Sequence, residues 1–304
     1  MLTFQRISPI LLIAAVLGSS AAAIADDTLP ASLIRIPESI STLFIAETST
    51  ARFHRFDRTS DGVVHNGSYY MSIGQNGAGK ERSGDRRTPL GVYFVTEQLD
   101  TSRLHDKYGV TAFPLDYPNA LDRHADRDGD GIWVHGVEPG GGQRPERDTD
   151  GCIALPNEDL RLLAPEFRDN VTPVLVTREV NWVDEEQARA LRAELEAQVA
   201  KWAVSQSNGD LYTFLSLYSD DFERWGMNKT EWSSLHLQAQ KSRATRHLGF
   251  SDLLLVAYPE EEGVYLSRFR LEVADDQRET IMTRRLYWRR DENGSLKIIA
   301  ENDG

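Results

Sequence analysis

The sequence contains only one cysteine, Cys152, and this scarcity excludes an internal disulfide. Exported domains that use cysteine structurally use it in pairs, so Cys152 is either a small buried hydrophobe or a reactive thiol. Its neighbours favour the reactive thiol. Gly151 lets a backbone approach a substrate closely. His135 stands upstream at the end of the apolar run 132–134, which suits a nucleophile–base pair.

Positive charge is also scarce. Against 47 Asp and Glu residues there are 34 Lys and Arg residues, and the formal net charge is −13. An acidic chain is a poor binder of nucleic acid and of anionic membrane surfaces. We therefore predict no nucleic-acid partner and attribute the charge to solubility.

Long hydrophobic runs are missing after the N-terminus. Arg6, the apolar run 10–17 and Ala23-Ile24-Ala25 together predict a signal peptide over residues 1–25. The run is too short and too rich in small residues to span a bilayer easily. We expect cleavage near Ala25, a periplasmic location, and no integral membrane segment in the mature protein.

Motifs for cofactors and metals are incomplete. The glycine-rich segment 73–80 has no GK(S/T) opening a helix, so it is interpreted as a mobile connection and not as a phosphate loop. Residues 126–131 match the first half of a calcium loop, but Val137 stands where the bidentate glutamate belongs. An acidic turn is the better interpretation, and no metal or cofactor is predicted.

Two segments resemble the L,D-transpeptidase (YkuD-type) catalytic domain. His135-Gly136, thirteen residues from Gly136 to Asp148, and then TDGCI at 149–153 are similar to the family's HG…(S/T)HGC(I/V)R signature. GDRRTPLGVY at 84–93 is similar to its GD-x-RTP-x-GVY segment. Two positions depart from the pattern, because the family usually has His where Asp150 stands and Arg where Ala154 stands. The TDGCIAL form is similar to a sub-branch that includes peptidoglycan-trimming carboxypeptidases and a lipoprotein-releasing amidase.

The resemblance implies that Cys152 is the nucleophile and His135 is the general base and later the acid. It implies that the carbonyl of Gly136 orients the imidazole, with Asp150 as the alternative orienting group. The amides of Gly151 and Cys152 are expected to bind the oxyanion. Arginine matches carboxylates, so candidates for the substrate carboxylate are four residues that could equally be solvated surface: Arg86, Arg87, Arg144 and Arg147.

The implied substrate is the diaminopimelate–D-Ala bond of peptidoglycan stem peptides. The acyl group would pass to an amine in a transpeptidase or to water in an L,D-carboxypeptidase. An amidase that releases a protein from peptidoglycan is a further alternative. A non-catalytic scaffold that binds the wall is the alternative from another class. The sequence does not separate these outcomes.

The chain is expected to hold a mainly-β catalytic domain at 41–178, after an irregular lead-in at 26–40 with a short central helix. An α+β cone is expected at 179–304, and WAVSQSNGDLYTFLSLYSDDF within it resembles NTF2-like domains, as in cell-shape L,D-carboxypeptidases. That resemblance leaves open a ligand pocket, a homodimer or neither. In the catalytic domain, strands are expected at 43–46, 52–56, 63–72, 90–97, 132–134 and 171–176, a structured loop at 108–119 and a helix at 157–163. In the cone, helices are expected at 184–205, 211–218 and 229–245, and strands at 250–258, 263–274, 280–289 and 295–301.

Overall fold

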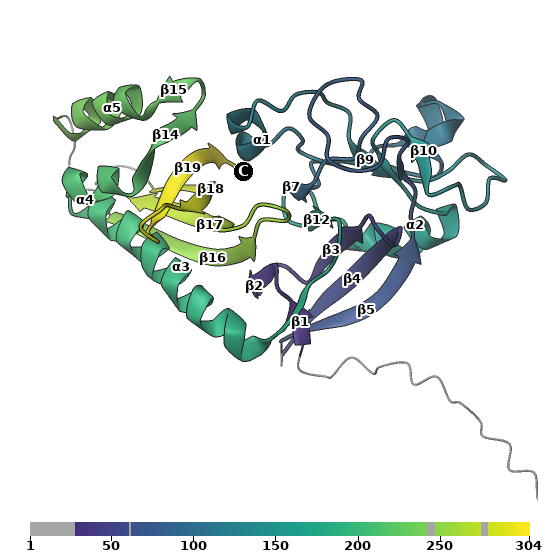
Figure 1. The fold of residues 1–304 in the computed structure, drawn as a ribbon, viewed down its shortest axis with the longest axis horizontal. Helices are drawn as coiled ribbons and strands as arrows, with labels where there is room; N and C mark the ends of the chain where they lie inside the picture. Colours follow the sequence, from purple (N-terminus) through teal and green to yellow (C-terminus); the bar gives the residue numbers. More distant parts are fainter. Residues whose placement is uncertain (1–27, 61, 242–246, 275–278) are drawn as a thin grey trace, which may run out of the picture.

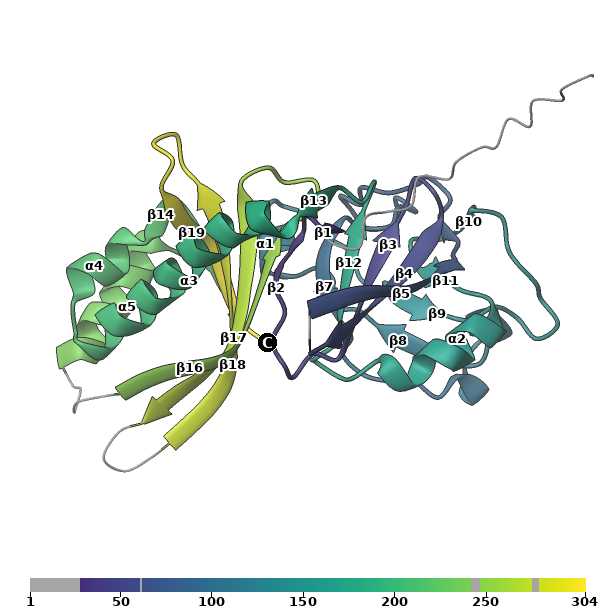
Figure 2. The ribbon, with the colours of Figure 1, turned by 90° about the horizontal axis from the view of Figure 1, so that it is seen from below.

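The computed structural model describes residues 28–60, 62–241, 247–274 and 279–304. The predicted signal peptide lies outside these ranges. Within them, no helix is both long enough and apolar enough to cross a membrane. Two β-sheets lie against each other at the centre, with the helices of the C-terminal half on one outer side and the rest of the N-terminal half on the other (Figures 1 and 2).

The N-terminal half is built on a five-stranded sheet in the order β5-β4-β3-β12-β7. Its central strand β3 is almost uniformly apolar, which is typical of a strand buried on both faces. Phe44 and Ala46 face one core, while Leu43 and Ile45 face another. The strand bounds are β3 Thr42–Glu47, β4 Arg52–Thr59, β5 Gly62–Tyr70, β7 Gly91–Phe94 and β12 Pro173–Thr177.

Smaller elements cover the first of these cores. A three-stranded sheet runs in the order β11-β9-β8, and β6 pairs with β10 in parallel. The expectation of a structured loop at 108–119 is wrong in part, because β8 lies within it. The bounds are β6 Ile73–Gly74, β8 Ala112–Pro114, β9 Trp133–His135, β10 Arg147–Thr149, β11 Ile153–Ala154 and α2 Asn157–Leu163. Helix α1 (Ala120–His124) belongs instead to the core of Leu43 and Ile45.

The C-terminal half is a curved sheet under helices, so the predicted mainly-β plus α+β cone fold class is confirmed. Strand β14 was not predicted; its segment has a polar, charged pattern. The helices are α3 Glu185–Ser207, α4 Leu211–Ser216 and α5 Lys229–Lys241; the end of the predicted helix 229–245 lies outside the described residues. The strands are β14 Tyr218–Arg224, β15 Met227–Asn228, β16 His247–Ala257, β17 Val264–Ala274, β18 Glu279–Arg290 and β19 Leu296–Asp303.

The lead-in is not irregular, and the short helix expected there is wrong. Strand β1 (Thr28–Pro30) pairs with β13 (Trp182–Asp184), and β2 (Leu33–Arg35) adds an edge strand beside β16. A three-residue strand has too little periodicity to be recognised locally, because its stability comes from a distant partner. The lead-in therefore belongs structurally to the C-terminal half.

One hydrophobic core joins the two halves. The face of the seven-stranded sheet opposite the helices packs on the five-stranded sheet, and Figure 2 shows the two sheets side by side. Leu43, Ile45 and Phe94 come from one half, and Leu254 and Leu266 come from the other. The two halves therefore bury a common interior and do not meet merely through surface side chains.

Candidate active site

His135 and Cys152 lie on neighbouring strands of the small sheet: His135 is the last residue of β9, and Cys152 directly precedes β11. The strands are parallel neighbours, with Val134 opposite Ile153 and His135 opposite Ala154. Side chains alternate along a strand, and cross-strand partners share a face. The side chains of His135 and Cys152 are therefore expected to project from the same face. The charge of Lys107 influences both groups, which agrees with a shared site.

His135 is held as a neutral base. Its side chain is buried, and burial lowers its pKa to about 4, although the Gly136 hydrogen bond opposes this shift. Nδ1 lies 2.6 Å from the carbonyl oxygen of Gly136. A carbonyl only accepts, so Nδ1 carries the proton and Nε2 keeps its lone pair. Tyr108 packs edge-on against the imidazole, with ring centroids 5.2 Å apart.

Cys152 rests as a half-buried thiol. Its Sγ donates to the carbonyl of Gly131 at 3.3 Å, and burial raises the thiol pKa, partly offset by the Trp133 amide. Within the described ranges, no hydrogen bond joins Sγ to His135. Nucleophile–base contacts are often long before a substrate binds, so this separation does not exclude the pair.

The turn before Cys152 is fixed by Thr149 and Gly151. Thr149 Oγ1 accepts from the Gly151 amide at 3.1 Å and donates to the carbonyl of Cys152 at 2.7 Å. Gly151 has φ +130°, and a Cβ there would lie 2.8 Å from the carbonyl oxygen of Arg87. Of the two amides predicted to bind an oxyanion, that of Gly151 is therefore occupied. The Cys152 amide makes no hydrogen bond in the described part of the chain.

Asp150 does not reach the imidazole. Its side chain is 67% exposed, and its two oxygens lie 3.8 Å from Arg86 Nε and 4.0 Å from Lys107 Nζ. Because Gly136 already occupies Nδ1, the alternative in which Asp150 orients His135 is not supported by this geometry.

The four predicted arginines are spread around the site. Arg144 influences the pKa of His135 and donates to Glu138 at 2.6 Å. Arg86 lies by Asp150 and donates to Gln75 at 2.9 Å. Arg87 donates to the carbonyl of Ala78 at 3.2 Å, and the guanidinium of Arg147 lies near Gly77. The structure thus brings Arg144 towards the imidazole and Arg86 towards Asp150, whereas the contacts of Arg87 and Arg147 are with the 77–78 loop.

Sequence reasoning missed three supporting groups. Asn157 Oδ1 accepts from the Val137 amide at 3.0 Å, and its Nδ2 donates to the Val137 carbonyl at 2.7 Å, so it fixes the segment after His135. Lys80 is buried and pairs with Asp85 at 2.8 Å. Burial alone would raise the pKa of Asp85, but hydrogen bonds from Lys80 and from backbone amides lower it to about 2. Lys107 was missed as well, and no local pattern marks it.

The segment 73–80 was also misjudged. Ile73, Gly74 and Ala78 are buried, and Gly74 is so tightly enclosed that a Cβ would lie 2.4 Å from the carbonyl oxygen of Arg86. Its glycines therefore allow close packing beside the Cys152 turn, and the interpretation as a loose connection is not supported.

Comparison with known proteins finds one family model that matches in each half. Residues 45–176 match the family model of the L,D-transpeptidase catalytic domain, YkuD. Residues 194–302 match the Cds6 C-terminal NTF2-like domain. No curated protein matches the chain in sequence.

Two solved structures resemble nearly the whole chain. The helical cell shape determining protein Pgp2 from Campylobacter jejuni is 25% identical, with coverage of 90% of this chain and 95% of Pgp2 and a TM-score of 0.75. Bd1075 from Bdellovibrio bacteriovorus is 24% identical, with coverage of 91% and 98% and a TM-score of 0.75.

Proposed function

We propose a reaction for this chain from its two domains, a YkuD-type L,D-transpeptidase catalytic domain and a Cds6-type NTF2-like domain. The match to the catalytic domain supports a peptidoglycan-modifying activity outside the cytoplasm. We propose that it cleaves the diaminopimelate–D-Ala bond of stem peptides through a Cys152 acyl-enzyme. The observation that carries this proposal is the neutral His135, anchored at Nδ1 by Gly136, on the strand paired with the one that directly follows the chain's one thiol.

In the proposed first step, Nε2 of His135 takes the thiol proton and Sγ attacks the diaminopimelate carbonyl carbon. The carbonyl oxygen becomes negative and accepts from the Cys152 amide, whose donor is unoccupied in the described chain. The carbon–nitrogen bond then breaks, His135 returns the proton to the leaving amine, and D-Ala departs. The product is a thioester on Cys152, with all atoms and charges accounted for.

The acceptor decides the class of enzyme. Attack by water, deprotonated by His135, gives a tripeptide and an L,D-carboxypeptidase. Attack by an amine gives a cross-link and an L,D-transpeptidase. The resemblance of the two domains to cell-shape L,D-carboxypeptidases makes hydrolysis the leading candidate of this proposal, and similarity to the cell shape determining protein Pgp2 over 90% of this chain agrees with it. Release of a protein from peptidoglycan uses the same acyl-enzyme and is the third candidate.

The substrate carboxylate needs a cation. Ala154, opposite His135, stands where the family usually has arginine, and its methyl side chain carries no charge. The cation must therefore come from another residue. Lys107 and Arg144 influence the imidazole, and we propose that they receive the carboxylate of the leaving D-Ala. Arg86, paired with Asp150, is the candidate for a carboxylate on the diaminopimelate side.

The test is product analysis by mass spectrometry after incubation with diaminopimelate-type tetrapeptide muropeptides. Wild type is compared with Cys152→Ala and His135→Ala. Tripeptide monomers from wild type alone support the carboxypeptidase, and dimers joined between third-position residues support the transpeptidase. Turnover by Cys152→Ala would overturn the acyl-enzyme. If wild type leaves both muropeptides and protein-linked peptidoglycan unchanged, the scaffold interpretation gains support.

The predicted signal peptide remains a prediction, and a periplasmic location with cleavage near Ala25 is part of the proposal. Amino-terminal sequencing of the exported protein tests it directly, with Asp26 as the expected first residue. A homodimer also remains open. It would have to use another surface, because the sheet face opposite the helices of the NTF2-like domain is covered by the catalytic domain.

A further inference from the structure

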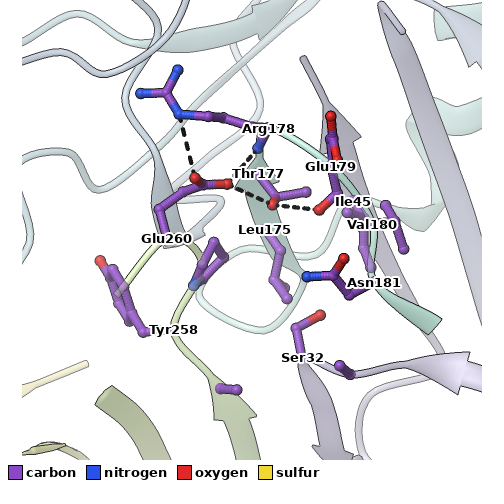
Figure 3. A pocket seen from close by; sticks show the side chains of 13 residues that line it. Ser32, Ile45, Leu175, Thr177, Arg178, Glu179, Val180, Asn181, Tyr258 and Glu260 are labelled. Carbon is purple, nitrogen blue, oxygen red and sulfur yellow. Dashed lines mark hydrogen bonds and ion pairs between the residues drawn. The ribbon is translucent and has the colours of Figure 1, made fainter. Parts of the chain in front are cut away.

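A cavity of about 380 Å³ lies where three segments meet at the domain junction (Figure 3). These are the turn between β1 and β2, the linker after β12, and the turn after β16. Ile45, Leu175 and Tyr258 contribute apolar surface, and Arg178 and Glu260 stand at its rim. None of its lining residues is near Cys152 in the sequence, but two of them, Arg178 and Glu260, are connected to the Cys152 turn through a series of contacts.

Glu260 of the NTF2-like domain holds the linker through three contacts. Its Oε1 accepts from the Arg178 amide at 2.8 Å and from Thr177 Oγ1 at 3.1 Å. Its Oε2 lies 3.3 Å from Arg178 Nε. These contacts are drawn in Figure 3. Glu260 has φ +63°, a strained conformation for a residue with a side chain, which persists only where the surroundings determine it.

The guanidinium of Arg178 continues the contact into the catalytic domain. It lies against Gly79, where a Cβ would be only 3.2 Å from Nη2. The Gly79 amide donates to the Thr88 carbonyl at 2.8 Å, and the Thr88 amide donates to the Gly77 carbonyl at 2.9 Å. Arg178 therefore packs on a short backbone ladder, in which two hydrogen bonds join Thr88 to the segment 77–79.

Two residues next to this ladder in the chain, Gln75 and Arg87, contact the turn of the nucleophile. The Gln75 amide donates to the Thr149 carbonyl at 2.8 Å. The Arg87 carbonyl oxygen lies directly against Gly151, where a Cβ would be 2.8 Å away. Thr149 and Gly151 are the residues that fix the conformation before Cys152. A contiguous set of contacts thus runs from Glu260 to the nucleophile.

We infer that Arg178 and Glu260 are positioning residues through which the NTF2-like domain keeps the Cys152 turn in its reactive geometry. The inference rests on the proposed function in that the thiol is the nucleophile. The competing explanation is that Arg178 and Glu260 only hold the two domains together and have no effect on Cys152. Partly exposed ion pairs contribute little to stability, so this pair is expected to matter for Cys152 more than for unfolding.

The experiment measures alkylation of the full chain by iodoacetamide as a function of pH. Cys152 is the only thiol, so the rate reports on that residue alone. In Glu260→Gln and Arg178→Met, a loosened turn admits water. We expect the midpoint of the profile to fall by about 0.5 pH unit or more, since burial raises the thiol pKa in the wild type. With muropeptide substrate, kcat should fall about tenfold while KM changes less than twofold.

Glu194→Gln is the matched control, because it breaks another partly exposed ion pair, with Arg290 at 2.7 Å, inside the NTF2-like domain. It should leave the alkylation profile and kcat unchanged. The double variant should be no worse than either single variant, since the two residues act as one unit. Profiles for Glu260→Gln and Arg178→Met that superpose on wild type would overturn the inference. If the profiles shift but wild type turns over no muropeptide, the proposed function fails and the positioning role stands.

Discussion

At the scale of the residue, burial sets the resting charges of His135 and Cys152. It lowers the pKa of the imidazole and raises that of the thiol, so both groups are neutral near pH 7. A preformed thiolate–imidazolium pair is therefore not the resting state. In the proposed reaction, proton transfer from Sγ to Nε2 therefore accompanies substrate binding.

The pKa of His135 makes stability depend on pH. The unfolded chain takes up a proton near pH 6.5, whereas the folded chain does so only near pH 4. Between these values protonation favours unfolding, so stability is fully present above about pH 6.5 and falls towards pH 4. The loss attributable to this group is about 3 kcal/mol. Urea unfolding of wild type and His135→Gln at pH 7.5 and pH 4.5 isolates it, since other groups titrate alike. An equal loss in both proteins would contradict the prediction.

Gly151 has a backbone conformation and a close backbone neighbour that a side chain would strain. Gly151→Ala places a Cβ 2.8 Å from a carbonyl oxygen at φ +130°, which we expect to cost about 1–3 kcal/mol of unfolding free energy and most of the turnover. Gly142→Ala is the control, because a Cβ there meets nothing within 4 Å. Thermal unfolding and muropeptide turnover are the measurements. A stable, active Gly151→Ala protein would show that the turn adapts.

At the scale of the element, the sequence predicted helices and strands that have a clear hydrophobic periodicity. It missed short elements and contacts that depend on a segment distant in the chain. The amphipathic α3 and the strands β16 to β19 carry their periodicity within themselves, so their existence was predictable. The neighbourhood of Lys107 and Asp150 was not, because a loop and a turn 43 positions apart in the chain meet only in the fold. The sequence also left the orienting group of His135 open between Gly136 and Asp150, whereas in the fold Nδ1 lies 2.6 Å from the carbonyl oxygen of Gly136.

Strand β2 shows how a short element can serve two cores. Leu33 and Ile34 are consecutive, so their side chains point to opposite faces, and each is buried in a different hydrophobic cluster. We expect Leu33→Ala and Ile34→Ala each to lower the unfolding free energy by about 2–5 kcal/mol.

Arg35→Ala is the control for these two variants, because its side chain is 44% exposed and ion-paired with Glu196. It should change stability by less than about 1 kcal/mol. Urea unfolding measures all three. If neither Leu33→Ala nor Ile34→Ala changed the unfolding free energy, β2 would be detached from the sheet in solution.

At the scale of the whole molecule, the two domains share an interior. Five-stranded and seven-stranded sheets bury their facing surfaces against each other, which resembles the inside of one domain more than a contact between two. Separating them would expose Leu43, Ile45 and Phe94 on one side and Leu254 on the other. Unfolding should therefore occur in one transition, and we expect each domain to depend on the other for its stability.

The ion pair of buried Arg285 with half-buried Asp116 crosses this interface and offers the sharpest test. Arg285 is 3% exposed, ion-pairs with Asp116 of the catalytic domain and lies 4.1 Å from the ring centroid of Phe94. Asp116→Ala leaves a buried cation without its partner, which we expect to cost about 3–5 kcal/mol in a single urea transition. Adding Arg285→Met removes that cation and should restore most of the loss. Two separate transitions, with only one displaced by Asp116→Ala, would mean that the domains unfold independently despite their common core.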